Sequence, residues 1–324
     1  MKAVMCQAHG LPDSLVYTDV ADPVAGKGQV VVDMKAAGVN FPDVLIIQNK
    51  YQAKPPLPFS PGSELAGIVS SIGEGVSNVK VGDSVIALCG WGAFAQKVVA
   101  PATGLIPMPA GLDFDTAASF TLTYGTSYHA IKDRAQLKAG ETILVLGAAG
   151  GVGLAAVQIA KALGARVIAA ASTEEKLAVC RASGADATIN YSTEDLRERI
   201  KALTEGKGPD VIYDPVGGDL AEPAFRSIAW RGRYLVVGFA MGDIPRLPLN
   251  LTLLKGASIV GVFWGEFTKR EPAQFAAGLR EMFGWMQQGK IKPLISHRYA
   301  LKDSAGALND MMNRKVTGKV IINA

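Results

Sequence analysis

The sequence contains few of the residues that mark disulfide-rich, metal-binding or strongly charged proteins. It has three cysteines and three histidines among 324 residues. Cys6, Cys89 and Cys180 are odd in number and far apart, which is typical of reduced thiols, so we expect a cytoplasmic protein. The formal net charge is +4 and both signs are mixed along the chain, which argues against a surface for nucleic acid or membrane lipid.

Long apolar runs are also scarce. Residues 143–160 form one uncharged run whose length is close to the lower limit for a membrane span. Four glycines lie within it, and the pattern changes there from strand-like to helix-like, so a buried strand, a turn and a buried helix explain it better. Residues 1–14 show neither the apolar region nor the cleavage site of a secretory signal. We therefore expect no membrane association.

Two patterns of secondary structure follow each other along the chain. Near the N-terminus, short segments rich in β-branched residues alternate with Gly and Pro, which predicts an irregular antiparallel barrel. Further on, strands alternate with helical patterns, which predicts a doubly wound parallel sheet covered on both faces. The predicted strands are 29–39, 64–72, 83–88 and 94–100, then 143–146, 166–170, 211–213 and 234–237, and finally 298–301 and 320–322; the predicted helices include 154–163, 174–182 and 272–288.

The strongest local signal is Gly147-Ala-Ala-Gly-Gly-Val-Gly153, between a predicted strand and a predicted helix. Glycines there allow a tight turn, a close approach of the backbone to a pyrophosphate, and close packing of helix on strand, while the N–H groups of the helix face the phosphate. Ala148 replaces the first glycine of the usual G-x-G-x-x-G pattern, although Gly150 and Gly153 keep the other two. We predict a Rossmann domain whose residues Gly147, Gly150, Gly151, Val152 and Gly153 contact a dinucleotide; a Gly-rich loop between packed elements is the alternative.

The end of the next predicted strand indicates which dinucleotide is bound. An NAD site usually has an acidic residue at that strand tip, to bind the ribose 2′-hydroxyl. Here the strand runs into Ser172-Thr-Glu-Glu-Lys176, and Ser172 with Glu175 fits a capping box for the following helix. The Ser172 hydroxyl and Lys176 would suit a 2′-phosphate, which favours NADPH. The alternative for Lys176 is a solvated lysine paired within its own helix.

Several further motifs carry a resemblance to a known family: Ala37-Gly-Val-Asn40-Phe-Pro-Asp43, Pro61-Gly-Ser-Glu64-Leu-Ala-Gly67, Val81-Gly-Asp-Ser-Val85, Thr126-Ser-Tyr128, Ile189-Asn-Tyr191 and Tyr213-Asp-Pro-Val-Gly-Gly218. Along nearly its full length the chain resembles the medium-chain dehydrogenase/reductase superfamily, and within it the zinc-free quinone oxidoreductases that include zeta-crystallin. The resemblance implies an α/β fold with a GroES-like irregular β-barrel domain, residues 1–122 and 263–324, and a Rossmann NADPH-binding domain, residues 123–262.

The resemblance also bears on metal binding. The zinc-dependent alcohol dehydrogenases of the superfamily have Cys and His where this chain has Asn40 and Ser63, and zinc binds Ser and Asn poorly. Their four-cysteine loop for a second zinc is reduced here to Cys89 alone. His9, His129 and His297 form no ligand motif. We expect no metal.

Contacts implied by the resemblance are then assigned residue by residue. Asn40 and Asp43 would flank the nicotinamide, Tyr51 would lie at the mouth of the site, Thr126 and Tyr128 would contact the cofactor, Ser172, Lys176 and Tyr191 would hold the 2′-phosphate end, Gly238, Phe239 and Ala240 would cover the nicotinamide, and Arg314 and Lys319 would be late basic contacts. Alternatives remain open for some of them. Tyr128 and Phe239 fit core aromatics, Asp43 fits a helix cap, and Arg314 fits solvated surface.

A reaction hypothesis follows from the missing zinc ligands. Without a Lewis acid, a site suits acceptors that delocalise the incoming charge, such as quinones and other conjugated carbonyl compounds. We expect Asn40 or backbone amides to hold the acceptor oxygen, with Tyr51 or water returning a proton.

Three further points stay open at the level of sequence. An enoyl-thioester or enone reductase would use the same cofactor, with Lys50, Lys54, Lys269 and Arg270 as a possible basic rim for an acyl-CoA. A non-catalytic NADPH-binding protein is the other alternative. Residues 257–263 are apolar and β-rich, which predicts an edge strand that pairs two copies in a homodimer.

Overall fold

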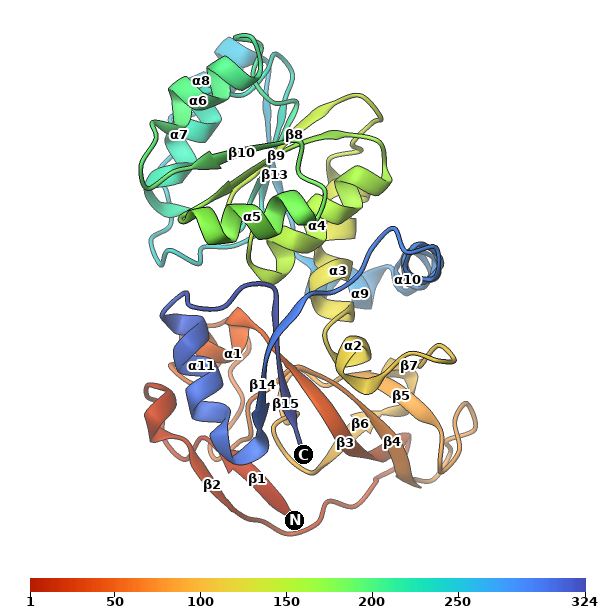
Figure 1. Cartoon of the computed structure of the whole chain (residues 1–324). Coiled ribbons are helices and arrows are strands. Elements are labelled where there is room, and N and C mark those ends of the chain that lie inside the picture. The colour runs from red at the N-terminus through yellow and green to blue at the C-terminus, as the bar shows by residue number, and fades with distance from the viewer. The chain divides into compact units, whose positions relative to one another are not determined.

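The computed structural model describes residues 1–324 and divides the chain into two compact units. Met1–Leu122 and Ile295–Ala324 form the first, here called the barrel unit, and Thr123–Leu294 form the second, here called the parallel-sheet unit. Figure 1 shows that the two ends of the chain, red and blue, meet in the same unit. The parallel-sheet unit is therefore inserted into the barrel unit.

The barrel unit is built around one long strand, β3 (Gln29–Val39), which pairs antiparallel with β4, β6 and β15. Its seven-stranded sheet has the order β14-β15-β3-β4-β5-β7, with β6 on β3. The other members are β4 (Glu64–Ile72), β5 (Ser84–Leu88), β6 (Lys97–Pro101), β7 (Leu105–Pro107), β14 (Ile295–Ala300) and β15 (Lys319–Asn323); β1 (Lys2–Met5) and β2 (Val16–Asp19) form a separate pair, and the helices are α1 (Phe41–Ile46), α2 (Phe114–Ala118) and α11 (Ser304–Met312).

The predicted strand at 94–100 begins later than expected, at Lys97. Phe94 lies before it in a turn, where its N–H donates to the carbonyl of Pro61 at 3.0 Å and its carbonyl accepts from the N–H of Val4 at 2.9 Å. The bond from Val4 belongs to an isolated antiparallel bridge between Ala3 and Ala95, so this segment pairs with the N-terminal strand before β6 begins to pair with β3. The predicted strands 29–39 and 64–72 coincide with β3 and β4, because a valine-rich run marks the first and the turn residues Pro61-Gly62 precede the second.

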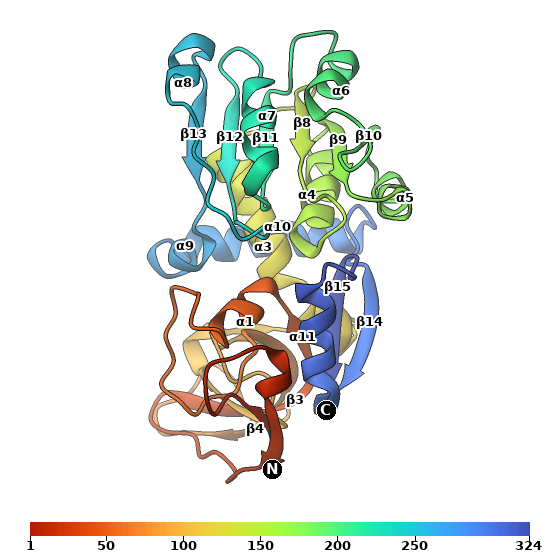
Figure 2. The ribbon, with the colours of Figure 1, turned by 90° about the vertical axis from the view of Figure 1, so that its left-hand side faces the viewer.

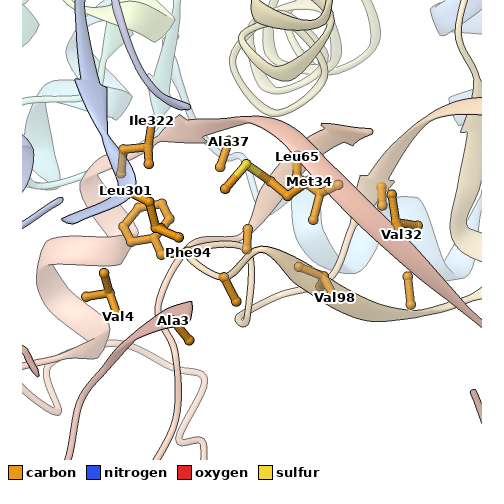
Figure 3. Close-up of a cluster of buried hydrophobic side chains, with 14 of the residues drawn as sticks. Ala3, Val4, Val32, Met34, Ala37, Leu65, Phe94, Val98, Leu301 and Ile322 are labelled. Atoms are coloured by element: carbon orange, nitrogen blue, oxygen red, sulfur yellow. The ribbon is translucent and has the colours of Figure 1, made fainter. Parts of the chain in front are cut away.

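A hydrophobic core fills the inside of the barrel unit (Figure 3). Val32 and Met34 alternate along β3 and point into it, as the two-residue period of a strand requires. They meet Phe94, which is fully buried, and Ile322 from β15, at the opposite end of the sequence. Each such side chain contributes about 1.5–3 kcal/mol on burial, so this core joins the two ends of the chain.

The parallel-sheet unit contains a six-stranded, wholly parallel sheet with the order β10-β9-β8-β11-β12-β13 (Figure 2). The first strand in sequence, β8, lies in the middle and the chain winds outward in both directions, which confirms the doubly wound Rossmann fold. The strands are β8 (Thr142–Val145), β9 (Arg166–Ala171), β10 (Ala187–Asn190), β11 (Val211–Asp214), β12 (Arg233–Val236) and β13 (Ser258–Gly261).

Helices cover both faces of this sheet (Figure 1), as expected for a parallel sheet whose central strands β8 and β11 are buried. Leu196 and Ile200 of one helix and Phe225 of the next pack on the sheet in a single cluster. None of the helices has both the length and the apolar character that crossing a membrane requires. The helices of this unit are α3 (Thr121–Tyr128, beginning at the end of the barrel unit), the π-helix η3 (His129–Arg134), α4 (Gly151–Ala162), α5 (Glu174–Ala182), α6 (Leu196–Leu203), α7 (Ala221–Arg226), α8 (Asn250–Lys255), α9 (Trp264–Arg270) and α10 (Pro272–Gln287).

The chain returns from the parallel-sheet unit to the barrel unit after Leu294, later than the predicted boundary at residue 263. Helix α10 belongs to the parallel-sheet unit through Tyr128 of α3. The ring of Tyr128 lies 5.8 Å from that of Trp285, and its hydroxyl donates to Glu281 Oε2 at 2.7 Å. The end of the Rossmann sheet was visible in the sequence, whereas the docking of the next two helices depends on contacts with α3, which precedes the whole sheet in the chain.

Candidate functional site

The glycine-rich turn joins β8 to α4 in the form that a dinucleotide site needs. Gly147 has a φ of +57°, a left-handed conformation that favours glycine. A Cβ at Gly153 would lie 2.4 Å from the carbonyl oxygen of Gly147, so only glycine lets the helix approach the strand this closely. A Cβ at Gly150 would meet nothing nearer than 3.5 Å. Packing within the protein therefore does not explain Gly150, and the space beside it fits the close approach of a pyrophosphate.

The N-terminus of α4 is the second element of this cradle. No side chain caps it, because Gly150 occupies the N-cap position. Its first N–H groups suit an anion, and the helix is 12 residues long, enough for an appreciable dipole. Ser127 holds the helix start in place, since its hydroxyl donates to the carbonyl of Val152 at 2.8 Å and lies 2.9 Å from the hydroxyl of Tyr213. The predicted contacts Gly151 and Val152 are the first two helical residues.

The residues predicted to bind a 2′-phosphate come together at the ends of β9 and β10. Lys176 Nζ lies 3.5 Å from Ser172 Oγ. Tyr191 follows β10, and its N–H donates to the carbonyl of Ala171, the last residue of β9, at 3.2 Å. No acidic residue stands between Ala171 and Thr173. A hydroxyl and an ammonium group at this strand end can hold a phosphate, and the strand tip has no carboxylate of the kind that binds a free ribose hydroxyl in NAD sites.

The predicted capping box from Ser172 to Glu175 is wrong. The N-cap of α5 is Thr173, whose hydroxyl accepts from the N–H of Lys176 at 3.3 Å. The helix starts one residue later than the capping box requires, so Ser172 lies outside it. This difference leaves the Ser172 hydroxyl beside the Lys176 ammonium and not on the helix backbone.

The loop after β11 packs against the glycine turn, and the loop after β12 packs against the loop after β11. A Cβ on Gly147 would contact Val216, and one on Gly217 would contact the ring of Phe239. Ala240 donates its N–H to the carbonyl of Pro215 at 3.1 Å. The predicted cofactor residues Gly238, Phe239 and Ala240 thus lie at the carboxyl edge of the sheet, where ligands bind in such folds. Phe239 is 37% exposed, which excludes the alternative of a core aromatic.

Asp214 organises these loops, a role that the sequence did not reveal. It is 3% exposed, and its carboxylate accepts from the N–H groups of Val216 and Gly217 at 2.8 and 2.9 Å and from the hydroxyl of Tyr234. Burial raises the pKa of Asp214 despite these donors. The sequence signal that could have indicated this role is an aspartate that ends a buried strand and directly precedes Pro-Val-Gly-Gly.

Two predicted cofactor residues lie on α3. Tyr128 is 8% exposed, its hydroxyl is bound to Glu281 and its ring packs on Trp285, so the structure favours the alternative of a core aromatic. Thr126 is half-buried on the same helix, two residues before it. A cofactor contact for Thr126 stays a prediction.

In the barrel unit, the predicted residues Asn40 and Asp43 form the start of α1. Asn40 is the N-cap, and its N–H donates to Asp43 Oδ2 at 2.8 Å. Both amide hydrogens of Asn40 are used, because Nδ2 donates to Glu64 Oε1 at 3.0 Å and to the carbonyl of Gly38 at 3.2 Å. Its Oδ1 accepts from Lys319 Nζ at 2.7 Å. Asn40 therefore offers no free donor for the oxygen of an acceptor, contrary to the expected role.

Lys319 lies inside the barrel unit and not on its surface. It is 3% exposed and Glu64 is fully buried, and the two form an ion pair at 2.8 Å. The remaining contacts of its ammonium are Asn40 Oδ1 and the carbonyl of Val39 at 3.3 Å. Three acceptors match the three N–H donors of a lysine, so a direct contact to a cofactor would require the loss of one of them. Arg314, the other late basic residue, follows α11 in a left-handed conformation with a φ of +57°.

Asp43 is a buried carboxyl of this site whose pKa is strongly raised. It is 2% exposed, and burial raises its pKa to about 7, against the opposing effects of the Asn40 N–H and the Lys319 charge. Burial and, to a lesser extent, the negative charge of Asp43 raise the pKa of Tyr51. Ser63 Oγ is buried and makes no hydrogen bond of good geometry, although the Ser63 hydroxyl is near enough to the Asp43 carboxyl to lower its pKa slightly. No group of three or more His, Cys, Asp or Glu residues in the chain is arranged to hold a metal ion.

Two family models match the two units. Residues 26–110 match the alcohol dehydrogenase GroES-like domain, and residues 151–283 match the zinc-binding dehydrogenase model. A GroES-like barrel that carries an inserted Rossmann sheet defines the class of medium-chain dehydrogenases/reductases.

Individual relatives narrow the class. The chain is 41% identical to a quinone oxidoreductase-like protein 2 homolog of Nematostella vectensis, covering 99% of this chain and 88% of that protein. It is 36% identical to the quinone oxidoreductase of Pseudomonas aeruginosa, covering 99% of each. The solved structure of Escherichia coli quinone oxidoreductase complexed with NADPH is 31% identical, covers 100% of both chains and superimposes with a TM-score of 0.95. The chain belongs to the quinone oxidoreductase family.

Proposed function

We propose that this protein is an NADPH-dependent reductase that transfers hydride to a quinone or another conjugated carbonyl compound without the help of zinc. The observation that carries the proposal is the pairing of Ser172 with Lys176 at the end of β9, next to the glycine turn. The similar structure from Escherichia coli was solved in complex with NADPH, which supports the same cofactor here.

The chain's own residues would hold the cofactor by its phosphates. The turn from Gly147 to Gly153 and the N-terminus of α4 would bind the pyrophosphate, while Ser172, Lys176 and Tyr191 would bind the 2′-phosphate. Gly238, Phe239 and Ala240 would lie over the nicotinamide. NADPH supplies the hydride, and the protein orients it.

The class of acceptor follows from the residues that surround the reacting oxygen. Asn40 and Ser63 stand where the zinc enzymes of the superfamily have metal ligands, and neither is a good ligand for zinc. Hydride addition to a quinone or to an α,β-unsaturated carbonyl gives a phenolate or an enolate, which spreads its charge and needs only modest hydrogen-bond donors. Because both amide hydrogens of Asn40 are already used, we assign the oxygen contact to backbone N–H groups and to the hydroxyl of Tyr51.

Stopped-flow oxidation of NADPH by a panel of quinones and enones tests this function. We expect turnover with quinones, a much weaker reaction with NADH, and none with simple aliphatic aldehydes or alcohols. In the Tyr51→Phe variant the rate of the hydride step should fall by about 10²-fold or more, the range for loss of a proton donor. Absence of NADPH oxidation with every acceptor would leave the non-catalytic alternative.

The acyl-CoA alternative gains no support from three of its four basic residues, all but Lys269. Lys50 donates to Gln48 Oε1 at 3.0 Å, Lys54 donates to the carbonyl of Asn49 at 2.6 Å, and Arg270 pairs with Glu266 at 2.8 Å. Each of these is a contact within the residue's own segment. The acceptor panel includes an enoyl thioester so that this alternative is measured directly.

We also propose that the protein is a homodimer that joins two copies through strand β13. This strand is the edge of the parallel sheet, and Figure 2 shows α8 beside its end. An apolar edge without a partner is an aggregation hazard, which a second copy would remove. The exposed apolar residues around it are Trp230 (68%), Leu249 (71%), Leu253 (79%), Leu254 (63%), Ile259 (37%) and Phe263 (58%).

Light scattering after size exclusion tests the dimer. The wild-type chain should have about twice the monomer mass, and the double variant Leu253→Glu/Phe263→Glu should be monomeric because charges at the centre of an apolar interface are costly. Val24→Glu is the matched control, since Val24 is also exposed, at 85%, but lies in the barrel unit. A monomeric wild type would overturn the proposal.

We also propose a cytoplasmic location. All three cysteines are free and two of them are buried, which fits a reducing compartment.

A further inference from the structure

The turn that carries Tyr191 joins β10, the edge strand beside β9, to α6 (Figure 2). Asn190, the last residue of β10, is paired in the parallel ladder with Ala171, the last residue of β9. Tyr191 and Ser172 therefore each follow this pair by one residue, at the carboxyl edge of two strands that lie about 4.8 Å apart. The N–H of Tyr191 donates to the carbonyl of Ala171 at 3.2 Å, which ties the turn to the end of β9.

All five backbone N–H groups of residues 190–194 have acceptors within the protein. Glu194 Oε2 accepts from the N–H of Asn190 at 2.8 Å. Asn190 Oδ1 accepts from the N–H of Ser192 at 3.1 Å. The carbonyl of Asn190 accepts from the N–H groups of Thr193 and Glu194 at 3.1 and 2.9 Å. Because the remaining N–H is the one already bound to β9, the turn can act on a phosphate only through its side chains.

Glu194 closes this turn with both its backbone and its side chain. Its N–H donates to the carbonyl of Asn190, while its carboxylate folds back to accept the N–H of the same residue. The second carboxylate oxygen, Oε1, forms an ion pair with Arg199 Nε of α6 at 2.7 Å. Both side chains are partly exposed, so water screens this pair and its own contribution to stability is modest. The ion pair holds the carboxylate where it can reach the turn.

These bonds determine the direction in which the Tyr191 side chain leaves the backbone. The peptide group before Tyr191 is held at its carbonyl and at its N–H, and the peptide group after it is held at the N–H of Ser192. A residue has only two soft backbone dihedral angles, so fixing both flanking peptide groups fixes its Cα–Cβ bond. The bond from Glu194 fixes the next peptide group upstream, at the N–H of Asn190.

We propose that Glu194 is a positioning residue for the 2′-phosphate of NADPH, which holds the turn so that Tyr191 is presented beside Ser172, and that Arg199 keeps the Glu194 carboxylate in place and offsets its charge. Glu194 itself touches no part of the cofactor in this arrangement. The inference rests on the proposed function, because that function assigns the 2′-phosphate to Tyr191 and its neighbours.

Equilibrium titrations with NADPH, 2′,5′-ADP and NADH test the proposal, because NADH alone among them lacks the 2′-phosphate. Glu194→Ala should weaken NADPH and 2′,5′-ADP by about 10-fold or more, as for a lost hydrogen bond to a charged group. The binding of NADH should be unchanged. A loosened fold would instead weaken all three ligands, so this difference separates positioning from a general loss of structure.

Two further variants provide a rescue and a matched control. Glu194→Gln keeps an oxygen for the N–H of Asn190 and loses only the exposed ion pair, so NADPH should bind within about threefold of wild type. Asp195 is the next residue, and its carboxylate also accepts a backbone N–H, that of Glu198 at 2.9 Å, but this bond caps α6. Asp195→Ala should lower the midpoint of thermal unfolding and leave the ratio of NADPH to NADH affinity unchanged.

A double-mutant cycle tests whether Glu194 acts through Tyr191. Tyr191→Phe removes the hydroxyl and should itself weaken NADPH, and adding Glu194→Ala to it should cost little more. Additive losses would overturn the proposal. So would equal weakening of NADPH and NADH by Glu194→Ala, no weakening of either, or a failure of Glu194→Gln to restore binding.

A second route is available if Glu194→Ala folds poorly. Arg199→Met leaves the Glu194 carboxylate without its cation and should weaken NADPH by about two- to fivefold, while NADH is unaffected. Adding Glu194→Gln removes the uncompensated charge and should restore the affinity for NADPH. No change with Arg199→Met, or a loss that Glu194→Gln does not reverse, would overturn the role of the pair.

These titrations need no acceptor, so they separate this inference from the proposed function. If no acceptor is reduced but the affinities shift as expected, hydride transfer fails and the positioning role of Glu194 survives. If Lys176→Met weakens NADPH selectively and Glu194→Ala does not, the inference fails alone. If the wild-type chain binds NADH as tightly as NADPH, the proposed cofactor preference and the inference fail together.

Discussion

The two units hold their candidate site residues by different means. In the parallel-sheet unit the cradle is made of backbone: a left-handed Gly147, an open Gly150, a Gly153 pressed on Gly147, and the uncapped start of α4. In the barrel unit the site is made of side chains that satisfy one another. The first kind of site can be recognised in a short stretch of sequence, whereas the second depends on partners from opposite ends of the chain.

The two sites also differ in the free energy needed to remove their groups from water. Backbone N–H groups at the start of a helix can bind an anion, although they carry no net charge of their own. Lys319 and Glu64 are both desolvated, so each is tolerable only while the other is present. Loss of one member of this buried pair should therefore cost stability, whereas loss of a phosphate contact in the parallel-sheet unit should cost cofactor binding.

The strongest test of that comparison removes one member of the buried pair. Lys319→Met should lower the free energy of unfolding by about 3–5 kcal/mol, because Glu64 is left as an uncompensated buried charge. Chemical denaturation measures the change. Arg298→Met, which removes the exposed partner of Asp115, should have a far smaller effect. Equal losses of unfolding free energy in the two variants would show that the buried ion pair contributes no more to stability than an exposed one.

A second test uses pH. The folded-state pKa of Asp43, about 7, lies above its ordinary value of 3.8, so the folded state binds more protons than the unfolded state between these values. The contribution of Asp43 to stability is therefore complete below pH 3.8 and is lost as the pH rises to about 7, by at most about 4 kcal/mol. Unfolding curves at several pH values should show this slope in wild type and a reduced slope in Asp43→Asn. If the stability of wild type and of Asp43→Asn depended on pH in the same way, the raised pKa of Asp43 would be contradicted.

In the parallel-sheet unit the expected losses are in binding. Lys176→Met should weaken NADPH by about 10–100-fold, the range for a hydrogen bond to a charged group, and should leave the weak binding of NADH unchanged. Fluorescence titration with both cofactors measures this. Arg181→Met, on the same helix but paired with Glu174, is the matched control. Equal weakening of both cofactors by Lys176→Met would remove the 2′-phosphate contact.

The smallest effects distinguish the two kinds of glycine. Gly153→Ala places a methyl group against the backbone of the turn and should cost about 1–3 kcal/mol of stability. Gly150→Ala meets no protein atom nearer than 3.5 Å, so stability should be unchanged while NADPH binding weakens. Thermal unfolding and cofactor titration on the same samples separate these results. If Gly150→Ala bound NADPH normally, the pyrophosphate would not lie beside it.

Much of the fold could be predicted from local patterns. The strands β3 and β4 and the helix α5 were predicted with their observed bounds, because valine-rich alternation and helical periodicity are properties of short segments. The doubly wound order of the sheet followed from alternating strands and helices with right-handed crossovers. Where two residues competed for one role, as Ser172 and Thr173 did for the cap of α5, the sequence was insufficient, since either hydroxyl suits an N-cap.

The chain's own sequence determined the Rossmann sheet, the glycine turn and the absence of an acid after β9, because each depends on neighbouring residues. Only the tertiary structure decided that Lys319 is buried with Glu64, that Asn40 has no free donor, and that α10 belongs with α3. Those outcomes depend on which distant segments a folded core brings together. A lysine near the C-terminus is the same residue on a surface or in a barrel, and desolvation alone distinguishes the two.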